Sequence, residues 1–238
     1  MKRLVLLFLL GLAGVAICAG ADADAAKRPT SSSTSPNPYV GTYTFIILPS
    51  TYTSLTSQPP IVGAFNVNVG AAGVLSGKGL LWHTNIVLRI SGGINSIGHG
   101  TFTVYRQPNA IYQKWIISSY AIGSAGISNV QNGKYIVFAP VSDTFPVAGS
   151  YHGTMSNGAR LEAVVFPDGE GQALLLGYYK LGYRAARFSG EVTPTSFLAY
   201  IAQYRVTLVG KFLANSKITG YYKVTNQTKV GTFGMNKQ

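Results

Sequence analysis

The chain has 238 residues and a formal net charge of +12 at pH 7, although only 11% of its residues are charged, against about a quarter in typical domains. Its 15 tyrosines and its aromatic share of 12% favour β-sheet over helix. The single cysteine excludes an intramolecular disulfide.

The first residues are typical of an export signal. Lys2 and Arg3 precede an apolar run over residues 4–17, and small residues follow at Ala21 and Ala23. The apolar run is shorter than the ~20 residues that a membrane-spanning helix needs. We therefore expect residues 1–23 to be a cleaved signal peptide and the mature protein to be exported, either periplasmic or extracellular.

Cys18 lies inside the expected signal peptide. Residues 15–17 resemble the segment before a lipid-acceptor cysteine, but Ile17 is larger than the residue usually found there. Either Cys18 carries a lipid, or cleavage removes it and leaves a cysteine-free mature chain. The second case excludes thiol chemistry and thiolate metal sites.

The mature chain stays strongly basic. Without Lys2 and Arg3 it has 17 basic residues against seven acidic ones, a net charge of +10, and no acidic residue lies between Ala25 and Ser142. This charge predicts attraction to an anionic envelope surface, or alternatively serves solubility alone. The basic residues are scattered, so they indicate no specific nucleic-acid site.

The remaining chain divides into a linker and an all-β domain. Residues 24–38 are rich in Ser, Thr and Pro and predict a flexible linker. Over residues 39–238, apolar-polar alternations recur between Gly, Asn, Asp and Pro, which predicts an antiparallel β-barrel or sandwich. Strands are expected at 41–47, 62–69, 80–90, 100–105, 112–119, 134–138, 149–154, 160–166, 172–179, 186–192, 204–212 and 217–224.

Residues 80–90 show the alternation clearly, with Trp82 and Leu88 on the expected core face and His83 and Arg89 on the solvent face. Tight turns are expected at Asn132-Gly133, Asn157-Gly158 and Pro167-Asp168-Gly169. Glycines inside expected strands predict β-bulges or sharp coiling; they are Gly177, Gly190, Gly210 and Gly220.

Two short motifs recur along the chain. Residues 40–43 (VGTY) resemble residues 148–151 (AGSY), and residues 100–102 (GTF) are repeated at 231–233. The recurrence leaves two arrangements open. One has two related β-units, 39–139 and 147–238, and the other is a single continuous barrel.

Catalytic and metal-binding groups are sparse. His83, His99 and His152 are isolated in the sequence and show no metal-ligand spacing. The carboxylates of the folded part are few; they are Asp143, Glu162, Asp168, Glu170 and Glu191. We assign no catalytic residue, no metal and no cofactor, and expect a non-enzymatic protein, because catalysis would require a cavity where a histidine meets a carboxylate.

Tyrosines crowd the second half of the chain and suggest a site for a small apolar or sugar-like ligand. The alternative role of these rings is core packing and cross-strand pairing. The candidate ligand-binding residues are Tyr178, Tyr179, Tyr183, Arg184, Tyr204 and Tyr222.

These observations favour an exported, non-catalytic binding or structural protein of the envelope or the secreted fraction. Two alternatives remain: an outer-membrane β-barrel, which the final residues Gly-Met-Asn-Lys-Gln do not favour, and a hydrolase of unknown class. No pattern indicates the oligomeric state.

Overall fold

The computed structural model describes residues 37–49, 61–84, 86–106, 110–117, 126–131, 134–141, 145–167, 172–214 and 216–238. They belong to one compact unit, Pro36–Gln238. The expected signal peptide, Cys18 and nearly all of the expected linker lie outside the described residues. So do Asn132-Gly133, Asp143, Asp168-Gly169 and Glu170.

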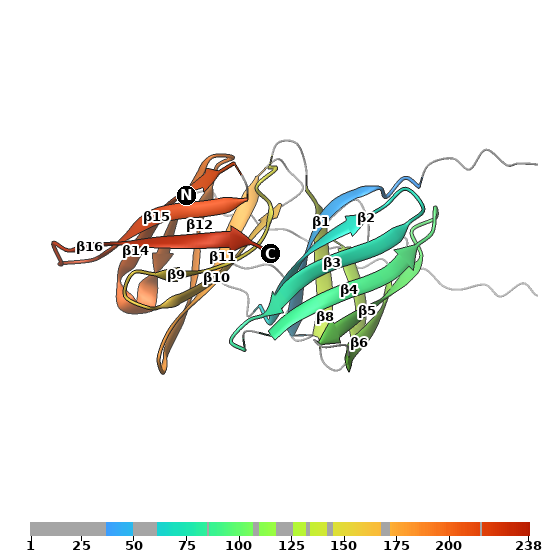
Figure 1. Ribbon diagram of the computed structural model, residues 1–238, viewed down its shortest axis with the longest axis horizontal. Coiled ribbons are helices and arrows are strands. Elements are labelled where there is room, and N and C mark those ends of the chain that lie inside the picture. The colour runs from blue at the N-terminus through green and yellow to red at the C-terminus, as the bar shows by residue number, and fades with distance from the viewer. Residues whose placement is uncertain are drawn as a thin grey trace, which may run out of the picture. The chain divides into compact units, whose positions relative to one another are not determined.

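The fold is all-β, as predicted, and its strands form two antiparallel sheets (Figure 1). The first sheet contains β1 (Gly41–Pro49), β2 (Gly63–Val69), β3 (Val74–Leu81), β4 (Ile86–Ile94), β5 (Gly100–Arg106), β6 (Ala110–Ile117), β7 (Gly126–Gln131) and β8 (Lys134–Pro140). The second is a closed barrel of β9 (Gly149–Met155), β10 (Arg160–Pro167), β11 (Ala173–Leu181), β12 (Arg184–Val192), β13 (Ser196–Ile201), β14 (Val206–Leu213), β15 (Lys217–Val224) and β16 (Val230–Lys237). The alternative of a single continuous barrel is therefore wrong.

The barrel interior is filled with side chains. Each strand alternates, so that residues such as Leu161, Ala163 and Val165 on β10 point inward while Arg160 and Glu162 point outward. The buried interior cluster includes the aromatic residues Phe145, Tyr151, Phe188, Phe197 and Phe233. These buried side chains form the core of the barrel.

Glycines face aromatic rings across the interior strand pairs. Gly177 pairs directly with Phe188, Gly210 with Phe197, and Gly220 with Phe233. A Cβ added at Gly177 would lie 2.0 Å from the Phe188 ring, so the ring occupies the space that a larger residue would need. Of the two alternatives predicted for these glycines, the bulges are wrong, because the barrel strands pair there in continuous register, and the sharp coiling stays a prediction.

The first sheet has the same neighbour order as the barrel, with β1 between β2 and β8 as β9 lies between β10 and β16. Its order runs β6-β5-β4-β3-β2-β1-β8-β7. Its inner face holds a separate core cluster, which includes Phe45, Phe65 and Phe102. Phe65 also lies against a glycine, Gly79, on the paired strand.

The repeated motifs adopt the same local structure. Gly41 and Gly149 open β1 and β9 with φ angles of 150° and 144°. The Tyr43 hydroxyl donates to the Tyr39 carbonyl at 3.0 Å, and the Tyr151 hydroxyl donates to the Val147 carbonyl at 2.6 Å. The unit boundaries 39–139 and 147–238 stay a prediction.

The two sheets contact each other through an apolar cluster. Ile46 and Leu48 of β1 and Leu80 of β3 pack with Val164 and Phe166 of β10, all with 0–3% exposure. These residues point away from the inner core of the first sheet and from the barrel interior. The outer face of the first sheet and the outer face of the barrel are therefore both apolar where they meet, and their contact removes these side chains from water.

The strand expected at residues 80–90 is wrong, and the strand expected at 204–212 starts two residues later than predicted. The expected strand at residues 80–90 is two strands, β3 and β4, joined by a turn in which His83 has a φ angle of 73°. Tyr204 belongs to a short 3₁₀ helix, Ala202–Tyr204, so β14 begins only at Val206. Strands β7, β13 and β16 were not expected. Among the described residues, no helix has the length and apolar character needed to cross a membrane.

Candidate functional site

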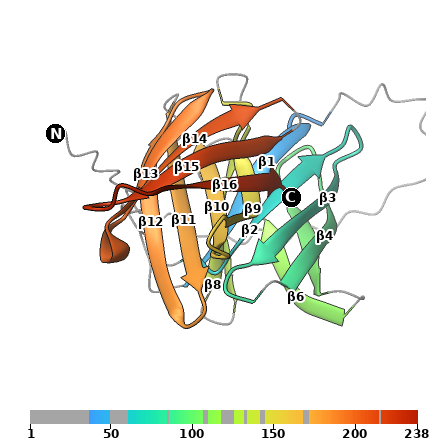
Figure 2. The same cartoon turned by 60° about the vertical axis from the view of Figure 1, so that its left-hand side comes forward.

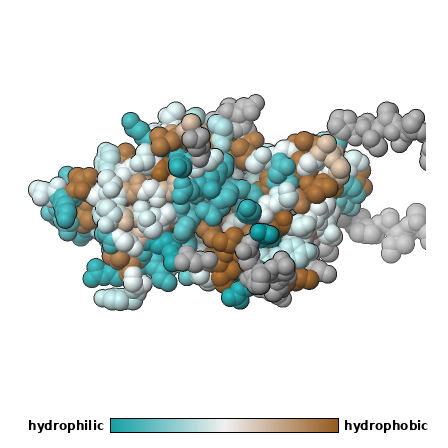
Figure 3. Space-filling view, viewed as in Figure 1, coloured by the Kyte–Doolittle hydropathy of each residue, from teal (hydrophilic) through white to brown (hydrophobic). Residues whose placement is uncertain are grey.

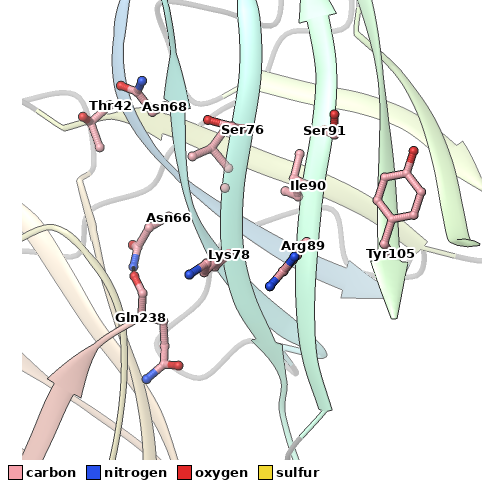
Figure 4. Close-up of a pocket in the computed structure, with 12 residues that line it drawn as sticks. Thr42, Asn66, Asn68, Ser76, Lys78, Arg89, Ile90, Ser91, Tyr105 and Gln238 are labelled. Carbon is pink, nitrogen blue, oxygen red and sulfur yellow. Dashed lines mark hydrogen bonds between the residues drawn. The ribbon is translucent and has the colours of Figure 1, made fainter. Parts of the chain in front are cut away.

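A depression of about 830 Å³ lies on the polar face of the first sheet (Figure 4). Its lining includes polar residues from β1 to β5 together with Gln238 at the end of β16. We call this depression the polar groove. The side chains come from the face of the sheet opposite the Phe45 core cluster, because strand residues alternate between the two faces.

Two rows of paired residues cross the sheet at the groove. Neighbours within each row are direct register partners on adjacent strands, about 5 Å apart. The first row is Thr44, Asn66, Lys78, Arg89 and Tyr105, and the second is Thr42, Asn68, Ser76, Ser91 and Thr103.

Lys78 and Arg89 are direct partners in the first row and lie side by side on β3 and β4 (Figure 4). Like charges at opposite positions of a strand pair destabilise it. Neither row contains an Asp or Glu, and no acidic residue occurs anywhere between Ala25 and Ser142. Lys78 and Arg89 therefore place two cationic side chains among the amide and hydroxyl groups of the groove.

Asn66 fixes one end of the groove against the barrel. Its Nδ2 donates to the backbone oxygens of Gln238 at 2.6 Å and Ser150 at 3.3 Å, and its Oδ1 accepts from the Ser150 N–H at 2.8 Å. The neighbouring Thr44 is fully buried, and its Oγ1 has no hydrogen-bond partner within the described part of the chain. The groove thus ends on ordered polar groups of both sheets.

The six predicted ligand-binding residues lie on or next to β11, β12, β14 and β15, and a shared ligand site at them stays a prediction. Tyr179 points into the barrel and contacts Tyr204, with ring centroids 5.5 Å apart and ring planes tilted by 55°. Tyr222 packs against the same core, and its hydroxyl lies 3.5 Å from Ser156 Oγ. These three rings fill one end of the barrel, which fits the alternative role of core packing.

Of the other three candidates, Arg184 lies near that cluster: burial raises the pKa of Tyr179, and Arg184 opposes that rise. Tyr183 is 93% exposed in the turn between β11 and β12, and Arg184 follows it at the exposed start of β12. Tyr178 points outward from β11 and contacts the His83 ring at a centroid distance of 3.7 Å. None of the six residues lines the polar groove.

Glu162 is a fully buried carboxylate on the outer face of β10, in register with His152 of β9 and Tyr178 of β11. Its Oε2 accepts the backbone N–H of His83 at 3.1 Å. Its Oε1 lies 3.9 Å from Arg160 Nη1 and has no hydrogen-bond partner in the described structure. Burial raises the pKa of Glu162, and the His83 N–H, Arg160 and Lys180 oppose that rise.

The two neighbouring histidines are biased toward their neutral forms. Burial, followed by the charges of Arg187 and Lys180, lowers the pKa of His83. Burial and Arg160 lower the pKa of His152. A histidine thus meets a carboxylate here, but the contact to Glu162 is made by the His83 backbone. The described residues contain no group of three or more His, Cys, Asp or Glu placed to hold a metal.

The sequence analysis missed the polar groove because it treated residues 80–90 as one strand. The sequence did contain a signal for a strand that ends at Leu81. Ser76 and Lys78 are two residues apart and Leu75 precedes them, a pattern that places the two polar side chains on the face opposite Leu75. No protein-family model matches the chain, and comparison with curated proteins and with solved structures finds no match either.

Proposed function

We propose that the protein is an exported, non-catalytic binding protein whose polar groove takes an anionic, hydroxyl-rich ligand such as a sulfated or phosphorylated saccharide. Lys78 and Arg89 would contact the anionic group. The amides of Asn66 and Asn68, the hydroxyls of Ser76 and Ser91, and the Tyr105 ring would contact the sugar.

The observation that carries this proposal is the direct pairing of Lys78 with Arg89 in a row without a carboxylate. An anion bound between the two side chains would relieve their repulsion and gain charge-assisted hydrogen bonds from both. The surrounding amides and hydroxyls suit a polyol better than an apolar ligand. The groove is open to solvent, which agrees with binding at a surface.

The polarity of the barrel supports an exported protein over an outer-membrane barrel. Membrane barrels turn an apolar band toward lipid and a polar surface inward. In this barrel Leu161 and Phe188 point inward, while Arg187 and Lys211 are exposed on the outside.

Isothermal titration calorimetry with a heparin-derived tetrasaccharide, and with its desulfated counterpart, tests the groove. We expect the sulfated sugar to bind and the desulfated sugar to bind more weakly. Lys78→Gln and Arg89→Gln should each weaken binding about tenfold, because a hydrogen bond to a charged group contributes roughly 1.5–3 kcal/mol.

Lys229→Gln is the matched control, because it removes an exposed charge from the turn between β15 and β16, outside the groove. It should leave the affinity nearly unchanged. Equal losses in all three variants would mean that the sugar responds only to net charge. That result, or no binding at all, would refute the groove as the site.

A further inference from the structure

A second surface lies on the outside of the barrel, across β13, β14 and β15, which run next to one another (Figure 2). Leu198 pairs with Val209, and Val209 pairs with Tyr221, so these three side chains form a continuous row. Tyr200 lies two positions beyond Leu198 on the same face of β13. Leu198, Tyr200 and Tyr221 are 51%, 44% and 49% exposed.

Lysines flank this apolar row on both sides. Lys211 is the next outward residue after Val209 on β14, and Lys223 is the next outward residue after Tyr221 on β15. Both are exposed. The described outward positions of β12 to β16 include one acidic residue, Glu191, which pairs with Leu198. We call this surface, Leu198, Tyr200, Val209, Lys211, Tyr221 and Lys223, the Tyr-Lys face.

We propose that the Tyr-Lys face docks the protein onto an anionic lipid bilayer. Tyrosine rings carry an apolar body and a polar tip, which suits the boundary between acyl chains and headgroups. Leu198 adds apolar area, and Lys211 and Lys223 would meet anionic headgroups. The net charge of the chain without Lys2 and Arg3, +10 from 17 basic and seven acidic residues, adds attraction toward such a surface.

The surface differs from the polar groove in what it offers a ligand. The groove presents amides and hydroxyls in a depression, whereas the Tyr-Lys face presents rings and aliphatic groups on continuous strands. In the space-filling view, pale and brown residues cover much of the barrel over β14 and β15, while hydrophilic residues gather toward the end of β16 (Figure 3). The inference is therefore separate from the proposed saccharide site.

Charge also disfavours a second copy of the chain as the occupant. A two-fold dimer would place the same patch of each copy against the other. Lys211 and Lys223 of both copies would then approach one another, and the acidic residue beside the face is Glu191, the partner of Leu198. A bilayer with anionic lipids offers the opposite charge across the whole face.

Co-sedimentation with vesicles tests the proposal. The probes are vesicles of phosphatidylcholine alone and of phosphatidylcholine mixed with phosphatidylglycerol. We expect the protein to sediment with the mixed vesicles only. Lys211→Gln combined with Lys223→Gln should weaken this binding about tenfold, since each lysine contributes appreciably near an anionic surface, and Tyr200→Ser combined with Tyr221→Ser should also weaken it.

Ile97→Ser and Arg106→Gln are the matched controls, because they remove an exposed apolar and an exposed basic side chain from the first sheet. Both should bind vesicles like the unaltered protein, and circular dichroism checks that every variant is folded. Binding that persists in the face variants, or that falls equally in the controls, would overturn the proposal. So would a dimer that the face variants dissociate without any binding to vesicles.

Discussion

Glu162 is buried in a chain that has few carboxylates, and its environment opposes ionisation. The His83 N–H occupies Oε2, whereas Oε1 has only Arg160 at the limit of ion-pair distance. Burying a carboxylate without full hydrogen bonding costs free energy. Glu162 therefore lowers stability when it is ionised, and its contribution depends on pH.

The pH dependence of Glu162 has a definite sign. Its pKa is raised above the usual value of 4.5, so the folded state holds the proton more tightly than the unfolded state does. The stabilisation is fully present below about pH 4.5 and is lost as the pH rises through the raised pKa. His83 and His152, whose pKa values are lowered from 6.5, behave oppositely, because their stabilisation is present above that value and is lost as the pH falls.

Glu162→Gln should therefore gain stability relative to the unaltered protein as the pH rises from 4.5 toward neutrality. The difference in unfolding free energy should grow by at most about 1.4 kcal/mol per pH unit. Urea unfolding at several pH values measures it, with Glu191→Gln as a control at an exposed carboxylate. A difference that stays constant with pH would contradict this role.

A second prediction concerns Tyr151, whose hydroxyl donates to the Val147 carbonyl at 2.6 Å just before the start of β9. Tyr151→Phe removes this bond and leaves the carbonyl of the half-buried Val147 without that donor. We expect a loss of about 1 kcal/mol in unfolding free energy. Tyr43→Phe tests the equivalent bond of the first sheet, and no loss in either variant would show that these bonds contribute little.

At the scale of strands, paired glycines and aromatic rings determine how closely the barrel strands pack. Gly177, Gly210 and Gly220 each lie opposite a phenylalanine on the neighbouring strand. The ring covers the glycine and fills interior volume that would otherwise be empty. Sequence periodicity placed these glycines in strands, but the partner that covers each one depends on strand register.

Gly177→Ala should destabilise the barrel by about 1–3 kcal/mol, because its new methyl group would overlap the Phe188 ring in a packed interior. Gly234→Ala is the matched control, because the nearest atom to its added Cβ, the Ile218 carbonyl oxygen, is 3.8 Å away. Thermal unfolding of both variants measures the difference. Equal melting temperatures would show that the Phe188 ring moves aside without cost.

At the scale of the whole molecule, the contact between the first sheet and the barrel couples the two. The apolar cluster around Phe166 and the hydrogen bonds of Asn66 both join them. The polar groove ends at this contact, because Asn66 and Gln238 both line it. Stability of the contact should therefore influence the geometry of the groove.

Phe166→Ala should lower the unfolding free energy by about 3–5 kcal/mol, since Phe166 is fully buried. Because Phe166 packs between the sheets, its loss should also separate their unfolding into two transitions in urea. Phe188→Ala, inside the barrel, is the comparison that should weaken the barrel directly. A single transition of unchanged steepness in Phe166→Ala would contradict the coupling.

The sequence predicted well where the alternation was regular. Residues 160–166 and 217–224 are strands within one or two residues of the expected bounds, and Asn157-Gly158 forms a turn in which the Gly158 φ is 81°. The prediction for residues 80–90 was wrong because the turn at His83 contains no glycine or proline, and its residues continue an apparent alternation of apolar and polar side chains. The prediction therefore failed where a non-glycine residue adopts a positive φ.

The sequence by itself determined the all-β class, the basic charge without acids in the first half, and the two recurring motifs, because period, composition and short patterns are local properties of the chain. Only the tertiary structure decided that there are two sheets, that Lys78 lies beside Arg89, and that the tyrosines divide between the barrel core and its surface. Strand order and register set these neighbours, and both depend on contacts between residues far apart in the sequence.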